Sequence, residues 1–110
     1  MNEYEFERVI DNTLSNAIKY SKASSEVNIF FGEEEGKVVI LVEDFGIGIE
    51  DTTKVFDAYY QQSNKKLGLG LGLNIVKEIC DKYKIDIEVK SEKSLGTKFI
   101  FNIDSVVKEV

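Results

Sequence analysis

The sequence contains no histidine and no proline, and its single cysteine is Cys80. Without histidine, a histidine-based catalytic triad and a zinc site are excluded, so that any metal must be held by oxygen ligands. A lone cysteine cannot form an internal disulfide, and its helical neighbours Val76, Ile79 and Tyr83 predict that it packs in a core. The chain also lacks an apolar run long enough for a membrane span or a signal peptide, so we expect a cytoplasmic domain without direct membrane contact.

Basic residues are scarce relative to acidic ones. Fourteen lysines and arginines stand against twenty aspartates and glutamates, which gives a formal charge of −6. Because nucleic-acid affinity comes largely from neutralising phosphates, nucleic acid is not an expected partner. A length of 110 residues is enough for one core, and we expect a single domain over 1–110.

The spacing of apolar residues predicts two helices and four strands. The helices are expected at 3–20 and at about 71–83, and the strands at 27–31, 37–44, 85–90 and 97–103. The first two strands should form a hairpin through the polar loop GEEEG, with the second strand the more buried. The last two should be joined by the turn SEKSLG, in which Gly96 is the expected left-handed position. Residues 104–110 show no clear pattern.

The first predicted helix has two distinct faces. Its polar face places Arg8, Asn12, Asn16 and Lys19 within a strip about 60° wide, with Tyr20 at the edge. Two asparagines one turn apart are unfavourable in a helix. The strip is either a solvated face or a row of amide oxygens and an ammonium directed at a ligand with phosphate and a hard cation. The opposite apolar arc consists of Phe6, Val9, Ile10, Thr13, Leu14, Ala17 and Ile18.

A carboxylate followed by alternating glycines closes the second predicted strand. Asp44 is a strong acceptor, and Gly46 and Gly48 allow the backbone to turn sharply beside it. This arrangement leaves room for a flat ligand, although an ordinary turn would have the same pattern.

Three more alternating glycines, Gly68, Gly70 and Gly72, lead into the second predicted helix. They let backbone N–H groups approach an anion, and the first amides of a helix are unpaired donors. Their spacing fits neither the Walker loop nor the dinucleotide fingerprint, so the motif alone indicates either a phosphate site or a flexible hinge. Lys65 and Lys66, just before it, are either a solvated pair or phosphate contacts.

Five segments, in order, resemble the catalytic and ATP-binding domain of bacterial sensor histidine kinases, part of the GHKL superfamily with the Bergerat fold. NTLSNAIKYS is similar to the asparagine box, VEDFGIGIED to the first glycine box, VFDAYYQ to the phenylalanine box and GLGLGLNIVKEI to the second glycine box, while LGTKFIFNI resembles the closing strand. The implied fold is an α/β two-layer sandwich: a mixed, mostly antiparallel sheet with helices on one face. ATP would lie between the asparagine helix and a lid at 51–67.

The resemblance also implies ATP and Mg²⁺ as ligands and assigns roles to individual residues. Asn16 would ligate Mg²⁺ between the phosphates, with Asn12 in support, and Lys19 would contact phosphate oxygens; these three are the implied catalytic residues. Tyr20 would pack near the nucleotide, and Asp44 would accept the exocyclic N–H of adenine. The other implied nucleotide-binding residues are Gly46, Gly48, Lys65, Lys66, Gly68, Leu69, Gly70, Leu71, Gly72 and Thr97.

The residue at position 12 distinguishes between reaction classes. In the gyrase-type, hydrolysing branch of the superfamily, a glutamate acts as general base one turn before the magnesium asparagine, and this chain has Asn12 there. An amide cannot accept a proton at neutral pH, so the γ-phosphoryl group is expected to go to a histidine instead of water. That histidine must belong to a separate dimerisation domain, and a response regulator would act downstream.

Several departures from the family pattern leave alternatives open. Leu69 replaces a usual threonine or serine, and Gln61 stands where a basic residue often follows the phenylalanine box. The asparagine box begins almost at Met1, which predicts either a fragment without the first helix and strand or strands or a shortened version of the fold. In both cases we expect marginal stability or association through an exposed sheet edge. The alternatives are a degenerate nucleotide-binding or protein-docking module and, less favoured by Asn12, a gyrase-type hydrolase.

Overall fold

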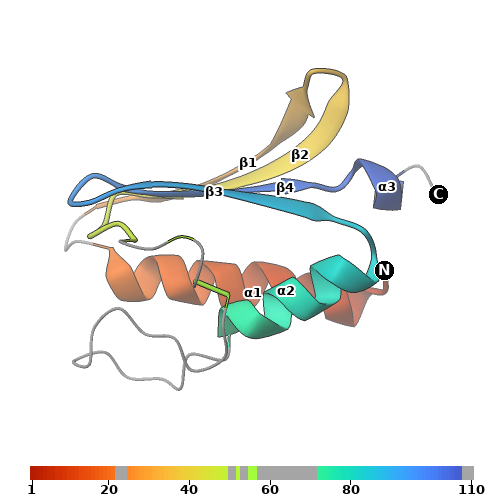
Figure 1. Ribbon diagram of the computed structural model, residues 1–110, viewed down its shortest axis with the longest axis horizontal. Coiled ribbons are helices and arrows are strands. Elements are labelled where there is room, and N and C mark those ends of the chain that lie inside the picture. The colour runs from red at the N-terminus through yellow and green to blue at the C-terminus, as the bar shows by residue number, and fades with distance from the viewer. Residues whose placement is uncertain (22–24, 50–51, 53–54, 57–71, 108–110) are drawn as a thin grey trace.

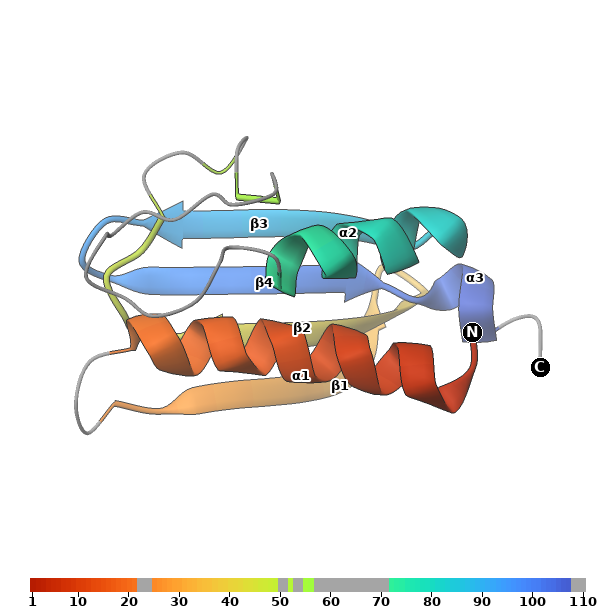
Figure 2. The same cartoon turned by 90° about the horizontal axis from the view of Figure 1, so that it is seen from below.

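The computed structural model has two layers, a sheet and a pair of helices (Figure 1). It describes residues 1–21, 25–49, 52, 55–56 and 72–107. The long helices α1 (Glu3–Tyr20) and α2 (Gly72–Lys82) lie side by side across one face of the sheet, as Figure 2 shows from below. The expected two-layer α/β sandwich is confirmed.

Helix α1 begins and ends at the residues that the sequence predicts. The side chain of Asn2 accepts a hydrogen bond from the backbone N–H of Glu5 at 2.8 Å and so caps the helix. Glu3 and Glu5 lie in the first turn and Lys19 in the last, which suits the helix dipole at both ends. Ser21 is extended and ends the helix.

The buried face of α1 is narrower than the apolar arc predicted for it. Val9, Thr13 and Ala17 are buried, and the Thr13 hydroxyl donates to the carbonyl of Val9 at 2.7 Å. Ile18, by contrast, is 64% exposed, so the apolar arc extends beyond the part of the helix that packs in the core. Ile18 lies in the last turn, about 100° around the helix from Ala17, on a flank that the sheet does not cover.

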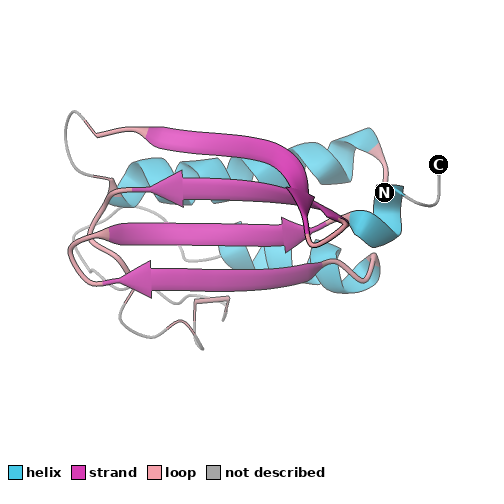
Figure 3. Ribbon diagram, turned by 90° about the horizontal axis from the view of Figure 1, so that it is seen from above, coloured by secondary structure: helices cyan, strands magenta, loops and turns pink. Residues whose placement is uncertain are grey.

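The sheet contains β1 (Val27–Glu34), β2 (Lys37–Asp44), β3 (Asp86–Glu92) and β4 (Gly96–Asn102). Figure 3 shows them in the order β1-β2-β4-β3, and every pairing among these described strands is antiparallel. Strand β2, in the interior of the sheet, is more buried than the edge strand β1, as predicted. The closing residues, Asp104–Val107, form the short helix α3.

The predicted GEEEG loop is wrong, because β1 continues through Glu34. Glu34 pairs with Lys37, which reduces the connection to Glu35 and Gly36. Both residues have positive φ, 53° and 79°, as in the two-residue turns whose twist matches that of a hairpin. Acidic residues are compatible with a strand here because this end of β1 is exposed to solvent. At the other hairpin, Gly96 has the expected positive φ, 134°, and Ser94 has one of 69°.

The core fills the space between the sheet and the two helices. Val42, Phe99 and Phe101 contribute from the strands, and Val76 and Cys80 from α2. The predicted burial of Cys80 is confirmed, and burial raises the pKa of its thiol to about 12. Cys80 is therefore a packing residue and not a nucleophile.

The turn that follows helix α2 contains a left-handed residue that is not glycine. Lys84 has a φ of 59°, and the N–H of Ile85 bonds back to the carbonyl of Cys80 at 2.8 Å, as at many helix ends that use glycine. Replacing Lys84 by glycine should remove the steric cost of a Cβ in this conformation and raise the free energy of unfolding by about 1 kcal/mol. Denaturant unfolding measures this gain. Lys84→Ala keeps the Cβ, so an equal gain in that variant would contradict the explanation.

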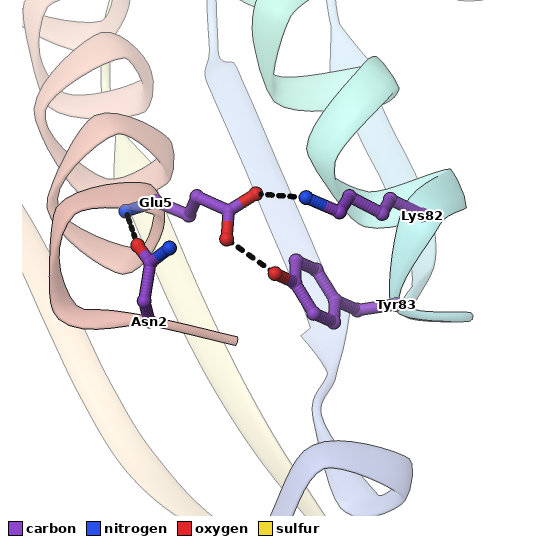
Figure 4. A network of polar contacts seen from close by, with 4 residues as sticks. All are labelled: Asn2, Glu5, Lys82 and Tyr83. Carbon is purple, nitrogen blue, oxygen red and sulfur yellow. Dashed lines mark hydrogen bonds and ion pairs between the residues drawn. The ribbon is translucent and has the colours of Figure 1, made fainter.

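A polar cluster ties the start of α1 to the end of α2 (Figure 4). Glu5 accepts a hydrogen bond from the Tyr83 hydroxyl and pairs with the Lys82 ammonium at 3.0 Å. The hydrogen bond from Tyr83 and the contact with Lys82 lower the pKa of Glu5. Because the pKa is lowered in the folded state, Glu5 stabilises the fold above its ordinary value of 4.5 and loses this effect as the pH falls below it.

The two edges of the sheet differ in chemistry. Strand β3 carries charged residues at alternate positions, beginning with Asp86 and Glu88, which discourage pairing with another strand. Strand β1 exposes Ile29, Phe30 and Phe31 instead, by 37%, 54% and 65%. Association through this edge stays a prediction.

Neither of the described long helices is both long and apolar enough to cross a membrane.

Candidate nucleotide-binding site

Three polar side chains lie in one row across the end of the sheet. Asp44 of β2 pairs with Thr97 of β4, and Thr97 pairs with Ser91 of β3. Directly paired residues share a face, and the next positions inward on this face include the buried Val42 and Phe99. The row Asp44–Thr97–Ser91 therefore faces the helical layer, at the end of the sheet nearest Tyr20.

Asp44 is a buried acceptor. The residue is 6% exposed, and the N–H of Gly46 donates to its Oδ1 at 2.9 Å. Burial raises the pKa of the Asp44 carboxyl, and the backbone N–H groups of Gly46 and Thr97 partly offset this effect. A carboxylate in this position gains from any ligand that supplies a further N–H donor.

The glycines after Asp44 are required by the fold itself. A Cβ on Gly46 would lie 2.0 Å from the carbonyl oxygen of Tyr20, and one on Gly48, whose φ is 78°, would lie 2.4 Å from that of Glu92. The N–H of Ile47 donates to the same Tyr20 carbonyl at 3.2 Å. The segment after β2 thus packs directly on backbone from α1 and from the end of β3. The implied role of these glycines beside a purine stays a prediction.

Asn12 connects the polar strip of α1 to the start of α2. Its Nδ2 donates to the carbonyl of Arg8 at 2.7 Å, and because a carbonyl can only accept, this bond fixes which end of the amide points there. The Oδ1 at the other end of the amide lies toward Gly72, 3.1 Å from where a Cβ on that residue would be. The structure therefore brings the predicted residues Asn12 and Gly72 together, with an amide oxygen between the two helices.

The other predicted residues of α1 lie at its C-terminal end. Asn16 is half-buried one turn after Asn12, and Lys19 and Tyr20 are half-buried beyond it. The Lys19 ammonium lies 5.4 Å from the centre of the Tyr20 ring, a favourable cation–π distance. Among the described residues, no group of three or more acidic or cysteine side chains is placed to hold a metal ion.

Part of the predicted site lies outside the described residues, and so does most of the predicted lid. The site residues concerned are Lys65, Lys66, Gly68, Leu69, Gly70 and Leu71. Two residues of the phenylalanine box are described. Val55 is buried, and the ring of Phe56 packs edge-on against Phe99 with centroids 6.2 Å apart. Asn74, near the start of α2, donates from Nδ2 to the carbonyl of Phe56 at 3.2 Å and so holds this segment against the helix.

Sequence reasoning missed two polar residues, Asn74 and Ser91. Ser91 accepts a hydrogen bond from the N–H of Ile49 at 2.6 Å. Its hydroxyl also contacts the carbonyl oxygen of Gly96 and the hydroxyl of Thr97 across the β3–β4 hairpin. A signal was present, since Ile87 and Val89 occupy the inward positions of the same strand and Ser91 continues their alternation. A hydroxyl at the next inward position needs hydrogen-bond partners.

The polar row and the asparagine strip occupy a fold that is found in known proteins. Residues 1–106 match the sequence model of the family described as "Histidine kinase-, DNA gyrase B-, and HSP90-like ATPase". The chain belongs to this family. The resemblance identified from the five sequence segments is thereby confirmed, and ATP is the nucleotide that the family description implies.

Curated relatives of this ATPase domain are bacterial sensor proteins. The chain is 41% identical over 106 residues to the sensor protein RprX of Bacteroides fragilis, covering 89% of this chain and 20% of that protein. It is 35% identical over 101 residues to the alginate biosynthesis sensor protein KinB of Pseudomonas aeruginosa, covering 90% of this chain and 17% of that protein. The chain thus spans about a fifth of the length of these relatives.

Solved histidine kinase structures share the fold of this ATPase domain. The mycobacterial sensor histidine kinase MprB superposes with a TM-score of 0.78 at 24% identity, over 92% of this chain and 70% of that one. Full-length ShkA, in complex with AMPPNP, gives a TM-score of 0.76 at 27% identity, over 88% of this chain and 20% of that one.

Proposed function

We propose that this ATPase-family domain is the catalytic, ATP-binding part of a two-component sensor histidine kinase. It would transfer the γ-phosphoryl group of ATP to a histidine of a separate dimerisation domain, and a response regulator would act downstream. The relatives are sensor proteins, and the sequence of this chain contains no histidine that could accept the group itself. A cytoplasmic location, with any membrane anchor elsewhere in a longer protein, belongs to the same proposal.

The observation that best supports the proposal is the orientation of the Asn12 side-chain amide. Its Nδ2 is committed to the Arg8 carbonyl, so that only the non-basic Oδ1 is directed toward the start of α2. A side chain of this kind cannot remove a proton from water, so hydrolysis has no general base at this position. An imidazole nitrogen needs no such help: it attacks phosphorus, an N–P bond forms, the bond to the β-phosphate oxygen breaks and ADP leaves.

The residues of the site suit a magnesium nucleotide. Amide oxygens are ligands that Mg²⁺ accepts, so Asn16, supported by Asn12, would hold the ion. Bound there, Mg²⁺ would neutralise part of the negative charge on the phosphates. Lys19 would contact phosphate oxygens as a point charge, and Asp44 would accept an N–H of the adenine amino group.

Replacing Asn16 by alanine should remove the magnesium dependence of ATP binding. The variant would lose one metal ligand without changing the buried face of α1, so we expect an affinity loss of about tenfold or more in the presence of Mg²⁺ and little change without it. Calorimetric titration with ATP, with and without Mg²⁺, measures both values. Ser15→Ala, on the exposed face of the same helix, is the matched control. Wild-type magnesium dependence in Asn16→Ala would refute the assignment.

The reaction itself is tested by mixing the chain with ATP, Mg²⁺ and a histidine-containing dimerisation domain. We expect acid-labile, base-stable phosphate on the dimerisation domain and only slow release of free phosphate when that domain is omitted. Rapid phosphate release without an acceptor would instead identify a gyrase-type hydrolase. Nucleotide binding without transfer to any acceptor domain tested would favour a module that has lost catalysis.

A further inference from the structure

The Ser91 hydroxyl is the centre of a hydrogen-bond network next to the proposed nucleotide site. Its Oγ lies 2.6 Å from the N–H nitrogen of Ile49, 3.0 Å from the carbonyl oxygen of Gly96 and 2.9 Å from Oγ1 of Thr97. These three groups belong to the segment after β2 and to the start of β4. One side chain therefore joins the two segments that flank Asp44.

Only one arrangement of the protons makes all three contacts hydrogen bonds at the same time. A hydroxyl has one proton to donate and can accept two hydrogen bonds. The Ile49 N–H can only donate and the Gly96 carbonyl can only accept, so Ser91 accepts from the first and gives its proton to the second. The remaining contact is satisfied only if Thr97 donates to Ser91.

The consequence concerns what Thr97 can offer a ligand. Thr97 is 4% exposed and pairs directly with Asp44, so the two side chains are neighbours in the row. Once its proton is held by Ser91, Thr97 can present only lone pairs, as the Asp44 carboxylate does. A base edge that carries N–H donors fits two adjacent acceptors, whereas a carbonyl oxygen there meets no donor from either residue and is repelled.

We propose that Ser91 is a positioning residue for base selection: by holding the Thr97 proton, it keeps this edge of the site free of a hydroxyl donor and thereby disfavours 6-oxo purines relative to 6-amino purines. The inference rests on the proposed function, because it assigns the base of the nucleotide to the Asp44–Thr97 edge. In this proposal Ser91 acts through Thr97 and not by contact with the nucleotide.

The test compares the affinities for ATP and ITP in the presence of Mg²⁺. In Ser91→Ala the Thr97 hydroxyl is free to donate to a 6-oxo group, so the ratio of the two affinities should fall by about threefold to tenfold. Ser91→Thr keeps the hydroxyl and should keep the ratio. Ser105→Ala, a serine at the opposite end of the sheet that bonds the carbonyls of Tyr83 and Lys84, is the control for loss of a hydroxyl.

A double-mutant cycle with Thr97→Val shows whether Ser91 acts through Thr97. Once the Thr97 hydroxyl is absent, adding Ser91→Ala should leave the ATP:ITP ratio unchanged. The proposal would be overturned if the ATP:ITP ratio stayed at the wild-type value in Ser91→Ala. It would also be overturned if Ser91→Ala changed this ratio equally in the wild type and in Thr97→Val. Equal weakening of both nucleotides would also overturn it, since it would indicate support of the segment and not selection of the base.

A measurement without ligand separates this inference from the proposed function. In the NMR spectrum of the free protein, the Thr97 hydroxyl proton should exchange slowly in the wild type and in Ser105→Ala, and rapidly in Ser91→Ala. If the wild type binds no nucleotide, the proposed function fails, and the exchange rate still decides whether Ser91 holds the Thr97 proton. Rapid exchange in the wild type would overturn that assignment.

Discussion

Replacing Asp44 by asparagine should weaken ATP binding by about 10- to 100-fold and reduce the preference for ATP over GTP. The carboxylate is buried and accepts from the backbone N–H groups of Gly46 and Thr97, and because its two oxygens can accept about four hydrogen bonds, it can still accept one from a ligand. In asparagine one of the two oxygens becomes an NH₂ group, which repels the adenine amino group and suits a 6-oxo group. Titration with ATP and GTP measures both effects, and Asp86→Asn, at the exposed far end of β3, is the control. Unchanged affinities for both nucleotides would disprove the role of Asp44.

The same substitution should leave the ligand-free domain as stable as the wild type, or more stable. Burial raises the pKa of Asp44 above its ordinary value of 3.8, so the folded state favours the protonated form. The contribution of Asp44 to stability is therefore greatest below pH 3.8 and declines as the pH rises through the raised pKa. In Asp44→Asn the side chain does not ionise, so the free energy of unfolding does not fall for this reason as the pH rises. Because Glu5 has the opposite dependence, the measured quantity is the difference in unfolding free energy between variant and wild type from pH 3 to pH 7.

The largest effect on stability is expected from Gly46→Ala. A Cβ at this position would lie 2.0 Å from the Tyr20 carbonyl oxygen, and backbone on both sides cannot yield as a flexible side chain would. The segment after β2 and the end of α1 must then separate, which should cost about 3 kcal/mol or more. Chemical denaturation followed by circular dichroism gives the change in unfolding free energy.

Gly32→Ala is a matched control for this experiment. A Cβ on Gly32 would meet nothing within 4 Å, and Gly32, like Gly46, has no positive φ. Alanine in a strand is favoured over glycine by about 0.5–1 kcal/mol, so this variant should be neutral or slightly stabilised. Equal destabilisation of the two variants would mean that the contact with Tyr20 is not the cause.

The features predicted correctly depend on residues close together in sequence. The bounds of α1 follow from its apolar spacing and from the polar residues at its ends, and the burial of Cys80 follows from its neighbours in α2. The alternation in β4 likewise predicted a strand with one buried face. Local propensity and periodicity are sufficient for such features because packing agrees with them.

The features predicted wrongly or missed depend on what lies opposite in space. Glu33 and Glu34 belong to a strand because β2 is there to pair with them, although their charge suggested a loop. Ile18 is apolar and exposed because it lies on a flank of α1 that does not face the sheet. The alternation of β3 could place Ser91 on the inward face, but its hydrogen-bond partners come from other segments, so no local pattern could identify them.

The burial of Cys80 has a practical consequence for following this domain with spectroscopic probes. Its thiol is the only one in the sequence, is inaccessible and has a pKa of about 12, so thiol reagents at neutral pH will leave it unmodified. A cysteine introduced at an exposed position such as Leu95, in the turn before β4, would then react alone. A single fluorophore or spin label can thus be attached beside the Asp44–Thr97 edge without first replacing the native cysteine.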